Sequence, residues 1–125
     1  MKIYLASRFN RALEMQQVKA DLEKRGHTIT SKWISTKGVP RSDKKSYYAR
    51  YSVNDLKDLC EAQALIAFTE PPPTASGGGR HVELGVAIGR GMRTIVIGPR
   101  ENIFCHLPTI EWYPDYLTFL ASVKL

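Results

Sequence analysis

The first half of the chain alternates between strand-like and helical patterns of hydrophobic residues. The apolar run at residues 2–6 is typical of a buried strand. Residues 27–34 alternate in polarity and are rich in β-branched side chains, which predicts a second strand. Between the two strands, apolar residues recur at helical spacing, and Gly26 stands where a helix would end. Those apolar residues are Ala12, Met15, Val18 and Leu22.

The middle of the chain predicts a loop, a helix and a third strand. Gly38 and Pro40 favour a loop over residues 35–42. A second helix is expected from about residue 44 to residue 61. The continuous apolar run at residues 64–69 is the pattern of a strand that is covered on both faces. The apolar positions of the second helix include Tyr48, Tyr51, Leu56 and Leu59.

The last part of the chain predicts one more buried strand between two helices. A third helix is expected over residues 80–90, with Gly91 just beyond its end. Residues 94–97 form another apolar run and predict the fourth strand. The tail is expected to hold a short turn around residues 104–107 and a last helix near residues 113–123.

Strands that alternate with helices predict an α/β fold with a parallel sheet and helices on both faces. A chain of 125 residues has the size of one domain, so residues 1–125 are expected to form a single unit. In such sheets the ligand binds beyond the carboxyl ends of the strands. That rule nominates residues 7–10, 33–37, 69–80 and 99–102.

Composition narrows the class of protein without choosing a function. Hydrophobic residues make up 43% of the chain and charged residues 24%, as in ordinary globular proteins. No apolar run approaches the roughly 18 residues that span a bilayer, and the two cysteines have no metal-ligand spacing. We therefore expect a cytoplasmic protein with free thiols. The net charge of +6 favours an anionic partner such as a nucleotide phosphate or nucleic acid, although a solvated basic surface explains it equally well.

The segment from Ser76 to Arg80 is the most informative one for chemistry. Gly77, Gly78 and Gly79 follow a strand and precede a helix, where free backbone N–H groups can bind an anion. Arg80 adds a guanidinium group that suits a phosphate or a carboxylate. The spacing matches neither the dinucleotide-binding pattern nor a P-loop, so an ordinary glycine-rich loop is the competing interpretation.

Glu83 lies in the first turn of the third helix, where the helix dipole stabilises any carboxylate. A surface glutamate is therefore one interpretation. Gly85 and Gly89 each cost about 1 kcal/mol in a helix interior, which suggests that the helix packs closely on the sheet and holds Glu83 rigidly. Asp55 and Asp58 lie one turn apart in the second helix. Either one could complete an acid–nucleophile pair with Glu83, or both could be solvated.

Two aromatic residues also have two interpretations. Tyr4 is the polar member of an apolar strand, so its hydroxyl either is satisfied within the core or donates to a catalytic carboxylate. Trp33 either stacks on a base or caps the core. The three histidines have no ligand-like spacing, so no metal and no cofactor are expected.

These residues together resemble the nucleoside 2-deoxyribosyltransferase family, including its relatives that hydrolyse deoxynucleoside or modified-pyrimidine monophosphates. The resemblance covers most of the chain, from residue 2 to about residue 108. Its most specific parts are residues 78–87 and residues 95–104, and Asp55-Leu56 and Gly26-His27 support them. It implies a flavodoxin-like, doubly wound parallel sheet of about five strands, and a role in nucleotide salvage.

The resemblance also assigns roles to residues. Glu83 matches the nucleophile that attacks C1′ of the sugar, Tyr4 the tyrosine that orients it, and Asp55 the residue that handles the proton of the departing base. Neighbouring subunits of the family complete each other's pockets, which implies a homodimer or a larger homo-oligomer. The residues expected to do so here are Asn102, Phe104 and His106. The other expected substrate-binding residues are Ser7, Arg8, Trp33, Ser76, Gly77, Gly78, Gly79 and Arg80.

Departures from the family pattern keep several alternatives open. Nucleoside-specific transferases carry an aspartate a few residues before the nucleophile, where this chain has Ser76-Gly77-Gly78. Together with Arg80, this favours a 5′-monophosphate substrate. Transfer of deoxyribose to another base and hydrolysis of the same bond are both compatible with the sequence. A non-catalytic nucleotide-binding module is the alternative from another class, and a nucleic-acid partner is not expected.

Overall fold

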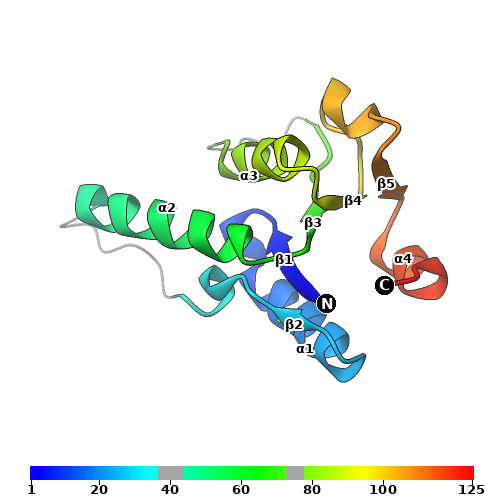
Figure 1. Ribbon diagram of the computed structural model, residues 1–125, viewed down its shortest axis with the longest axis horizontal. Coiled ribbons are helices and arrows are strands. Elements are labelled where there is room, and N and C mark those ends of the chain that lie inside the picture. The colour runs from blue at the N-terminus through cyan, green and yellow to red at the C-terminus, as the bar shows by residue number, and fades with distance from the viewer. Residues whose placement is uncertain (37–43, 73–77) are drawn as a thin grey trace.

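The computed structural model describes residues 1–36, 44–72 and 78–125, and contains one sheet of five parallel strands. Across the sheet the strand order is β2-β1-β3-β4-β5, so β1 lies next to one edge and the last strand, β5, forms the other edge (Figure 1). The α/β fold with a doubly wound parallel sheet is thereby confirmed. The strands are β1 (Lys2–Ala6), β2 (Thr28–Ile29), β3 (Ala64–Phe68), β4 (Arg93–Ile97) and β5 (Ile110–Tyr113).

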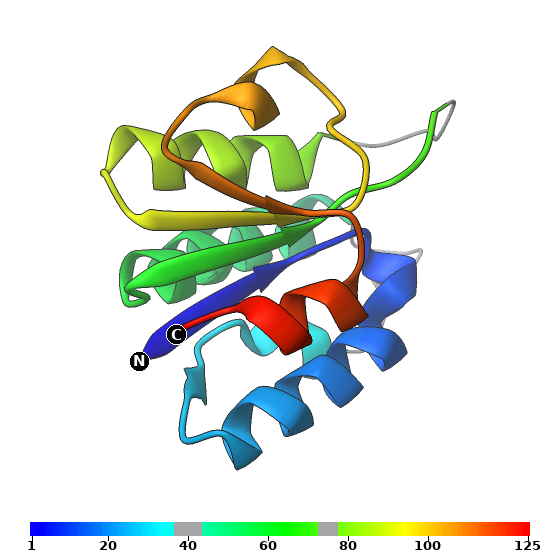
Figure 2. The same ribbon diagram turned by 90° about the vertical axis from the view of Figure 1, so that its right-hand side faces the viewer.

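Helices cover both faces of the sheet. On one face α1 (Ala12–Lys24) lies beside α4 (Tyr116–Ser122), as Figure 2 shows, and Tyr116 Oη donates to Asp21 between them at 3.2 Å. On the other face lie α2 (Lys44–Cys60) and α3 (Gly79–Gly89) (Figure 1). No helix in the described part of the chain is long and apolar enough to cross a membrane.

The core sits between these layers and is built on the three central strands. All five residues of β3 are buried, and so are residues 3–6 of β1 and 94–97 of β4. Complete burial of consecutive residues requires cover on both faces, which is why these strands are recognisable in the sequence as unbroken apolar runs. The first helix and the third helix were also placed correctly, each within one residue to three residues of its observed bounds.

The second strand is much shorter than expected. Only Thr28–Ile29 pairs with β1, and the chain then forms a 3₁₀ turn, η2 (Lys32–Ser35), where the sequence predicted strand to residue 34. At Leu5, side chains take the place of the backbone partners that a longer β2 would supply. The N–H of Leu5 donates to Ser31 Oγ at 3.0 Å, and its carbonyl accepts from Trp33 Nε1 at 2.8 Å. The backbone of Leu5 is thus satisfied without a longer strand. Most of the expected loop over residues 35–42 lies outside the described residues.

The fifth strand was not located from the sequence. Residues 110–113 pair with β4, and the last helix begins only at Tyr116, later than expected. Every residue of β5 is partly exposed, so the segment shows neither an apolar run nor an alternation. Just before β5, the 3₁₀ turn η3 (Ile103–His106) matches the expected turn.

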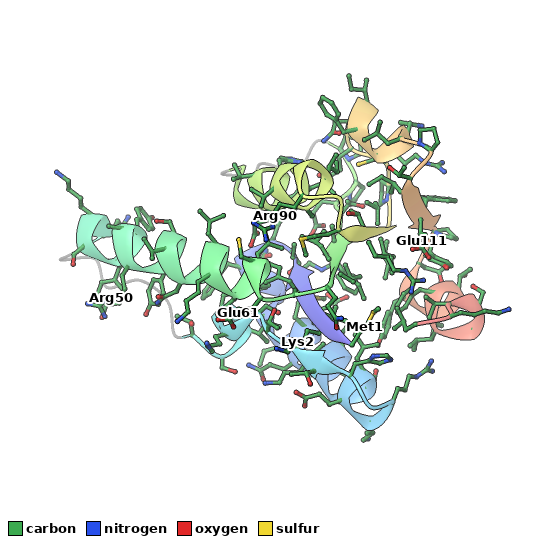
Figure 3. All side chains as sticks on the ribbon, viewed as in Figure 1. Met1, Lys2, Arg50, Glu61, Arg90 and Glu111 are labelled. Carbon is green, nitrogen blue, oxygen red and sulfur yellow. The ribbon has the colours of Figure 1, made fainter. Side chains whose placement is uncertain are left out.

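The second helix extends beyond the sheet. Its N-terminal half, which carries Arg50, lies away from the body of the protein (Figures 1 and 3). Tyr48, in that half, is 58% exposed. Of the other apolar positions of this helix, Leu56 is 41% exposed, whereas Leu59, nearer the sheet, is fully buried.

The glycines of α3 do not pack on the sheet, contrary to the expectation. A Cβ atom added at Gly85 or Gly89 would meet no atom within 4 Å, and both residues are exposed. The face of α3 that packs on the sheet is formed instead by Arg80, Leu84 and Ala87, which are spaced by one turn. Gly85 and Gly89 lie on the opposite side of the helix.

Candidate active site

Tyr4 and Glu83 meet at the centre of the molecule. Tyr4 belongs to β1 and is fully buried, and its hydroxyl donates a hydrogen bond to Glu83 Oε2 on α3. The phenol projects from the strand, and the helix presents the carboxylate from its second turn. The sequence placed Glu83 in the first turn of the helix, which was wrong: α3 begins at Gly79 and has no acidic residue in its first turn. Both interpretations of Tyr4 fit this geometry, because the residue packs in the core and its hydroxyl is satisfied by a carboxylate.

Glu83 holds its proton more tightly than an ordinary glutamate. Burial raises its pKa from 4.5 to about 7, because the charged form loses hydration. The hydrogen bond from Tyr4 acts in the opposite direction and lowers the pKa, and the negative charge of Asp55 raises it further. The carboxyl therefore exchanges its proton near neutral pH, where a small change in its surroundings decides its charge.

Asp55 is the second carboxyl group of the site. It projects from α2, is half-buried, and has a pKa that burial and the neighbouring charge of Asp58 raise from 3.8 to about 6. Its charge acts on both Glu83 and Tyr4. Three elements distant in the sequence, β1, α2 and α3, thus bring Tyr4, Asp55 and Glu83 into one electrostatic unit.

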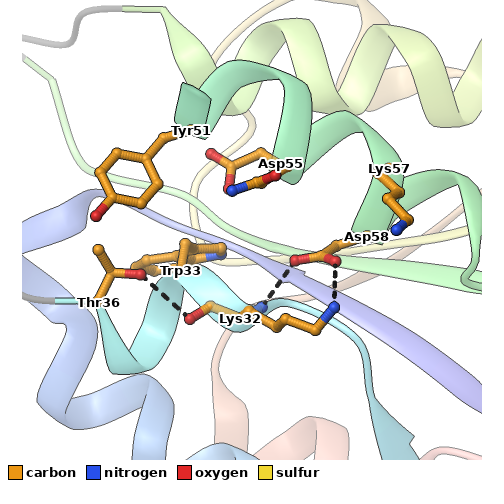
Figure 4. A pocket seen from close by; sticks show the side chains of 8 residues that line it. Lys32, Trp33, Thr36, Tyr51, Asp55, Lys57 and Asp58 are labelled. Atoms are coloured by element: carbon orange, nitrogen blue, oxygen red, sulfur yellow. Dashed lines mark hydrogen bonds and ion pairs between the residues drawn. The ribbon is translucent and has the colours of Figure 1, made fainter. Parts of the chain in front are cut away.

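A pocket of about 170 Å³ opens beside Asp55 between α2 and η2 (Figure 4). Trp33 forms part of its wall, and its indole is fixed by the hydrogen bond to the carbonyl of Leu5. The volume is below the roughly 300–1,000 Å³ of typical ligand pockets, so it suits one ring of a ligand. The lining residues are Lys32, Trp33, Thr36, Tyr51, Asn54, Asp55, Lys57 and Asp58.

Arg80 lies in a different environment from the one its sequence context suggested. Its guanidinium is buried, with the residue only 6% exposed, and pairs with both carboxylate oxygens of Glu101. The Nε–Oε1 distance is 3.1 Å. This pair joins the start of α3 to the segment after β4. The carboxylate of Glu101 also neutralises the positive charge of Arg80, which would otherwise be available to bind a substrate phosphate. The geometry therefore favours a structural role for Arg80.

The other expected residues near the strand ends are placed as follows. Ser7 and Arg8 follow β1 and are half-buried, and Ser7 Oγ donates to the carbonyl of Arg8 at 2.9 Å. Gly78 caps the start of α3 and Gly79 is its first residue. Ser76 and Gly77 lie outside the described residues.

Asn102, Phe104 and His106 do not line the pocket at Asp55. Asn102 and Phe104 instead border a shallow apolar groove along α3, beside Gly85 and Gly89. Asn102 Oδ1 accepts from the N–H of Phe104 at 2.9 Å and so begins η3, while the Phe104 ring and His106 are exposed. Within one chain, these three residues are separate from the carboxyl groups.

Some residues of the site had no clear signal in the sequence. Asp58, noted only for its spacing from Asp55, is buried against Lys32, and Tyr51 and Asn54 line the pocket. Lys32 was assigned to a strand, where an isolated lysine indicates only a solvent-facing position. The feature that could have revealed Asp58 is its place beside Leu59, at the end of the helix that is buried.

The fold and the site together define a flavodoxin-like α/β protein with a tyrosine in a central strand and two perturbed carboxyl groups on the helices that cover one face of the sheet. No family model and no curated protein matches the chain. Solved structures do match.

The chain is similar to a 2-deoxyribosyltransferase from the psychrotolerant bacterium Bacillus psychrosaccharolyticus, with a TM-score of 0.74 and 19% identity over 100% of this chain and 93% of the other. It is also similar to the CMP N-glycosidase BcmB of Clostridium botulinum, with a TM-score of 0.67 and 18% identity over 97% and 96% of the two chains. A conserved protein from Enterococcus faecalis V583 has a TM-score of 0.59 and 14% identity over 97% and 84%. At these identities the likeness establishes the fold, and it agrees with the resemblance noted in the sequence.

Proposed function

We propose that this chain is an enzyme of the nucleoside 2-deoxyribosyltransferase family that cleaves the N-glycosidic bond of 2′-deoxynucleosides or their 5′-monophosphates. The observation that carries the proposal is the hydrogen bond from buried Tyr4 to Glu83, with Asp55 close enough to raise the pKa of that carboxyl group. The fold is shared with a deoxyribosyltransferase and with a CMP N-glycosidase, which supports the choice of substrate class.

The reaction proceeds in two steps. The Glu83 carboxylate attacks C1′, so that an ester bond forms while the bond from C1′ to the base nitrogen breaks, and Asp55 gives its proton to the departing base. In the second step an acceptor attacks C1′, the ester breaks, and the proton of the acceptor passes to Asp55. If the acceptor is another base, the enzyme is a transferase. If the acceptor is water, it is an N-glycosidase.

The two perturbed carboxyl groups can share one proton near neutral pH. Burial raises the pKa of Glu83 to about 7, with a further contribution from the charge of Asp55, and burial raises the pKa of Asp55 to about 6. In the free chain the shared proton therefore rests mainly on Glu83, whereas the reaction needs it on Asp55, so the proposal requires the proton to move to Asp55 when substrate binds. The Tyr4 hydroxyl favours this arrangement, because it donates to Glu83 and stabilises the ionised form.

Hydrolysis of a 5′-monophosphate is the second candidate. It is favoured by the net charge of +6 and by the likeness to a CMP N-glycosidase. Arg80 does not support it, because its guanidinium group is paired with Glu101. A free phosphate-binding cation would have to come from another residue.

The proposal includes a homo-oligomer in which Asn102, Phe104 and His106 complete the pocket of a neighbouring copy. The position of Asn102 and Phe104 along α3, apart from the pocket of their own chain, supports it. Mixing two inactive variants, Glu83→Ala and Asn102→Ala, tests the idea after subunit exchange. Regained turnover supports a shared site, and two inactive variants that stay inactive together contradict it.

A product assay tests the function itself. The chain is incubated with each deoxynucleoside and each deoxynucleoside 5′-monophosphate, with and without an acceptor base. A new nucleoside that forms only with acceptor identifies a transferase, and free deoxyribose 5-phosphate identifies a hydrolase. Glu83→Ala is expected to abolish turnover, and a 2-fluoro analogue is expected to leave a sugar adduct on Glu83 that mass spectrometry detects. Glu111→Gln, which removes a carboxylate outside the site, is the control, and turnover by Glu83→Ala would overturn the proposal.

A further inference from the structure

Asp58 is a buried carboxylate that the proposed reaction does not use. It is only 2% exposed, and both of its oxygens are occupied by one residue of η2. Oδ2 accepts from the backbone N–H of Lys32 at 3.1 Å, and Oδ1 pairs with Lys32 Nζ at 3.2 Å (Figure 4). Because burying an unpaired charge is costly, this double contact explains how an anion persists at this position.

The partner of Asp58 is itself held in place. Lys32 begins the η2 turn, whose next residue, Trp33, is anchored to Leu5 through its indole. The backbone N–H of Lys32 is therefore a fixed donor, whereas its ammonium group reaches Asp58 from a side chain that is 77% exposed. Asp58 thus has one backbone contact that fixes its position and one ion pair at the protein surface.

Asp58 stands one helical turn after Asp55, on the same side of α2, and both line the same pocket. A like charge at this spacing disfavours the ionised form of its neighbour. The direction fits: the charge of Asp58 is a cause of the raised pKa of Asp55, second to burial. The charged and titratable groups around Asp55 are Asp58, Lys57 and Tyr51 of α2, Lys32 of η2, Glu83 of α3 and Tyr4 of β1.

We propose that Asp58, held by Lys32, is a positioning residue that favours a proton on Asp55, so that Asp55 can act as the acid toward the departing base. Asp58 acts through Asp55 and does not itself touch the reacting atoms. The catalytic part of this inference rests on the proposed function. Its electrostatic part concerns only the described residues, and it can be measured in the absence of any substrate.

Two substitutions separate this role from a structural one, because they shift the Asp55 titration in opposite directions. Asp58→Asn keeps an acceptor for the Lys32 N–H but removes the negative charge, so the pKa of Asp55 falls, by about one pH unit. Lys32→Met keeps the backbone contact but removes the cation that offsets Asp58, so the pKa of Asp55 rises. This second shift is smaller, about half a pH unit, because the ammonium is exposed and screened by solvent.

The measurement is a carboxyl ¹³C NMR titration of Asp55 in the wild-type chain and the two variants, with thermal unfolding as a check that each variant is folded. Lys24→Met, which removes one exposed cation from α1 on the other face of the sheet, is the matched control and should leave the Asp55 midpoint unchanged. The inference is overturned if Asp58→Asn does not lower the midpoint. It is also overturned if both variants move it in the same direction, as a loosened turn would do.

Turnover supplies the second readout. An acid must be protonated, so activity is lost as pH rises through the pKa of Asp55. This alkaline limb of the kcat profile should move to lower pH in Asp58→Asn and to higher pH in Lys32→Met. If the wild-type chain cleaves no nucleoside, the proposed function fails while the NMR titration still decides whether Asp58 controls Asp55. If the wild-type chain shows turnover but the Asp55 midpoint is the same in the wild-type chain and both variants, the inference about Asp58 fails while the proposed function stands.

Discussion

Replacing Glu83 with glutamine should stabilise the folded chain at alkaline pH while it removes turnover. The folded state keeps a proton on Glu83 up to a pKa of about 7, whereas the unfolded chain releases it near the ordinary value of 4.5. Between these two values the folded state binds more protons, so the free energy of unfolding falls as pH rises. The substituted amide is neutral at every pH and still accepts the hydrogen bond of Tyr4.

The magnitude follows from the difference between the two pKa values. At about 1.4 kcal/mol for each pKa unit, ionised Glu83 costs the folded state about 3 kcal/mol above pH 7. At pH 4 both states are protonated and the cost disappears. Glu83→Gln should therefore match the wild-type chain at pH 4 and exceed it by about 3 kcal/mol at pH 8, which corresponds to about 10 °C in the melting temperature.

Urea unfolding at pH 4, 6 and 8 measures the effect, and the product assay measures turnover in the same preparations. Glu111→Gln is the control with the opposite sign. Arg93 lowers the pKa of Glu111, so its ionised form stabilises the fold and its removal should reduce stability as pH rises above the ordinary value. If the stability of Glu83→Gln relative to the wild-type chain does not rise between pH 4 and pH 8, burial does not raise the pKa of this carboxylate and the reasoning is refuted.

Three further predictions concern neighbouring features. Tyr4→Phe removes the donor that lowers the pKa of Glu83, so the acid limb of the pH–rate profile should move up by about one pH unit and the rate at pH 6 should fall about tenfold. Arg80→Ala leaves the partly buried carboxylate of Glu101 without its guanidinium partner, so unfolding experiments should show a loss of about 3 kcal/mol, and nucleosides and monophosphates should be affected alike. Gly85→Ala should raise the stability of the isolated chain by about 1 kcal/mol, because the added methyl group meets no neighbour; a loss would indicate that another chain covers this face.

The central part of the fold could be predicted because burial leaves a direct trace in the sequence. The runs at β1, β3 and β4 are apolar on both faces, and only a sheet covered by helices on both sides requires that. Two helix ends were equally clear. Gly26 and Gly91 adopt φ values of +90° and +66°, the left-handed conformation that terminates a helix.

The two edge strands of the sheet could not be predicted, and the reason differs between them. At β2 the side chains of Ser31 and Trp33 take the places of backbone partners, a substitution that hydrophobic patterns do not reveal. At β5 partial exposure removes the pattern altogether. The prediction for Gly85 and Gly89 was wrong for another reason. Glycine destabilises a helix interior, which suggested that close packing requires it there, but the structure leaves that face of α3 open.

The candidate site was predictable only in part. The resemblance to a known family selected Tyr4, Asp55 and Glu83, and the structure brings all three together. The contact between Lys32 and Asp58 depends on the η2 turn, which replaced the expected strand. Because residue 32 was predicted to lie in a strand, the sequence did not reveal that Lys32 pairs with buried Asp58, next to Asp55.

The two interpretations of Glu83 can now be compared by magnitude. As a surface residue in the first turn of a helix, it would gain about 0.3–1 kcal/mol from the helix dipole, and its pKa would fall. The observed environment raises the pKa to about 7, a cost of about 3 kcal/mol when the group is charged, even though Tyr4 donates to it. Burial therefore outweighs the dipole by a factor of three or more. Accepting the hydrogen bond of buried Tyr4 is one structural role of Glu83, and a neutral glutamine would also accept it. Carboxylates held at such a cost are typical of active sites, so this imbalance supports the proposal that Glu83 acts on a substrate.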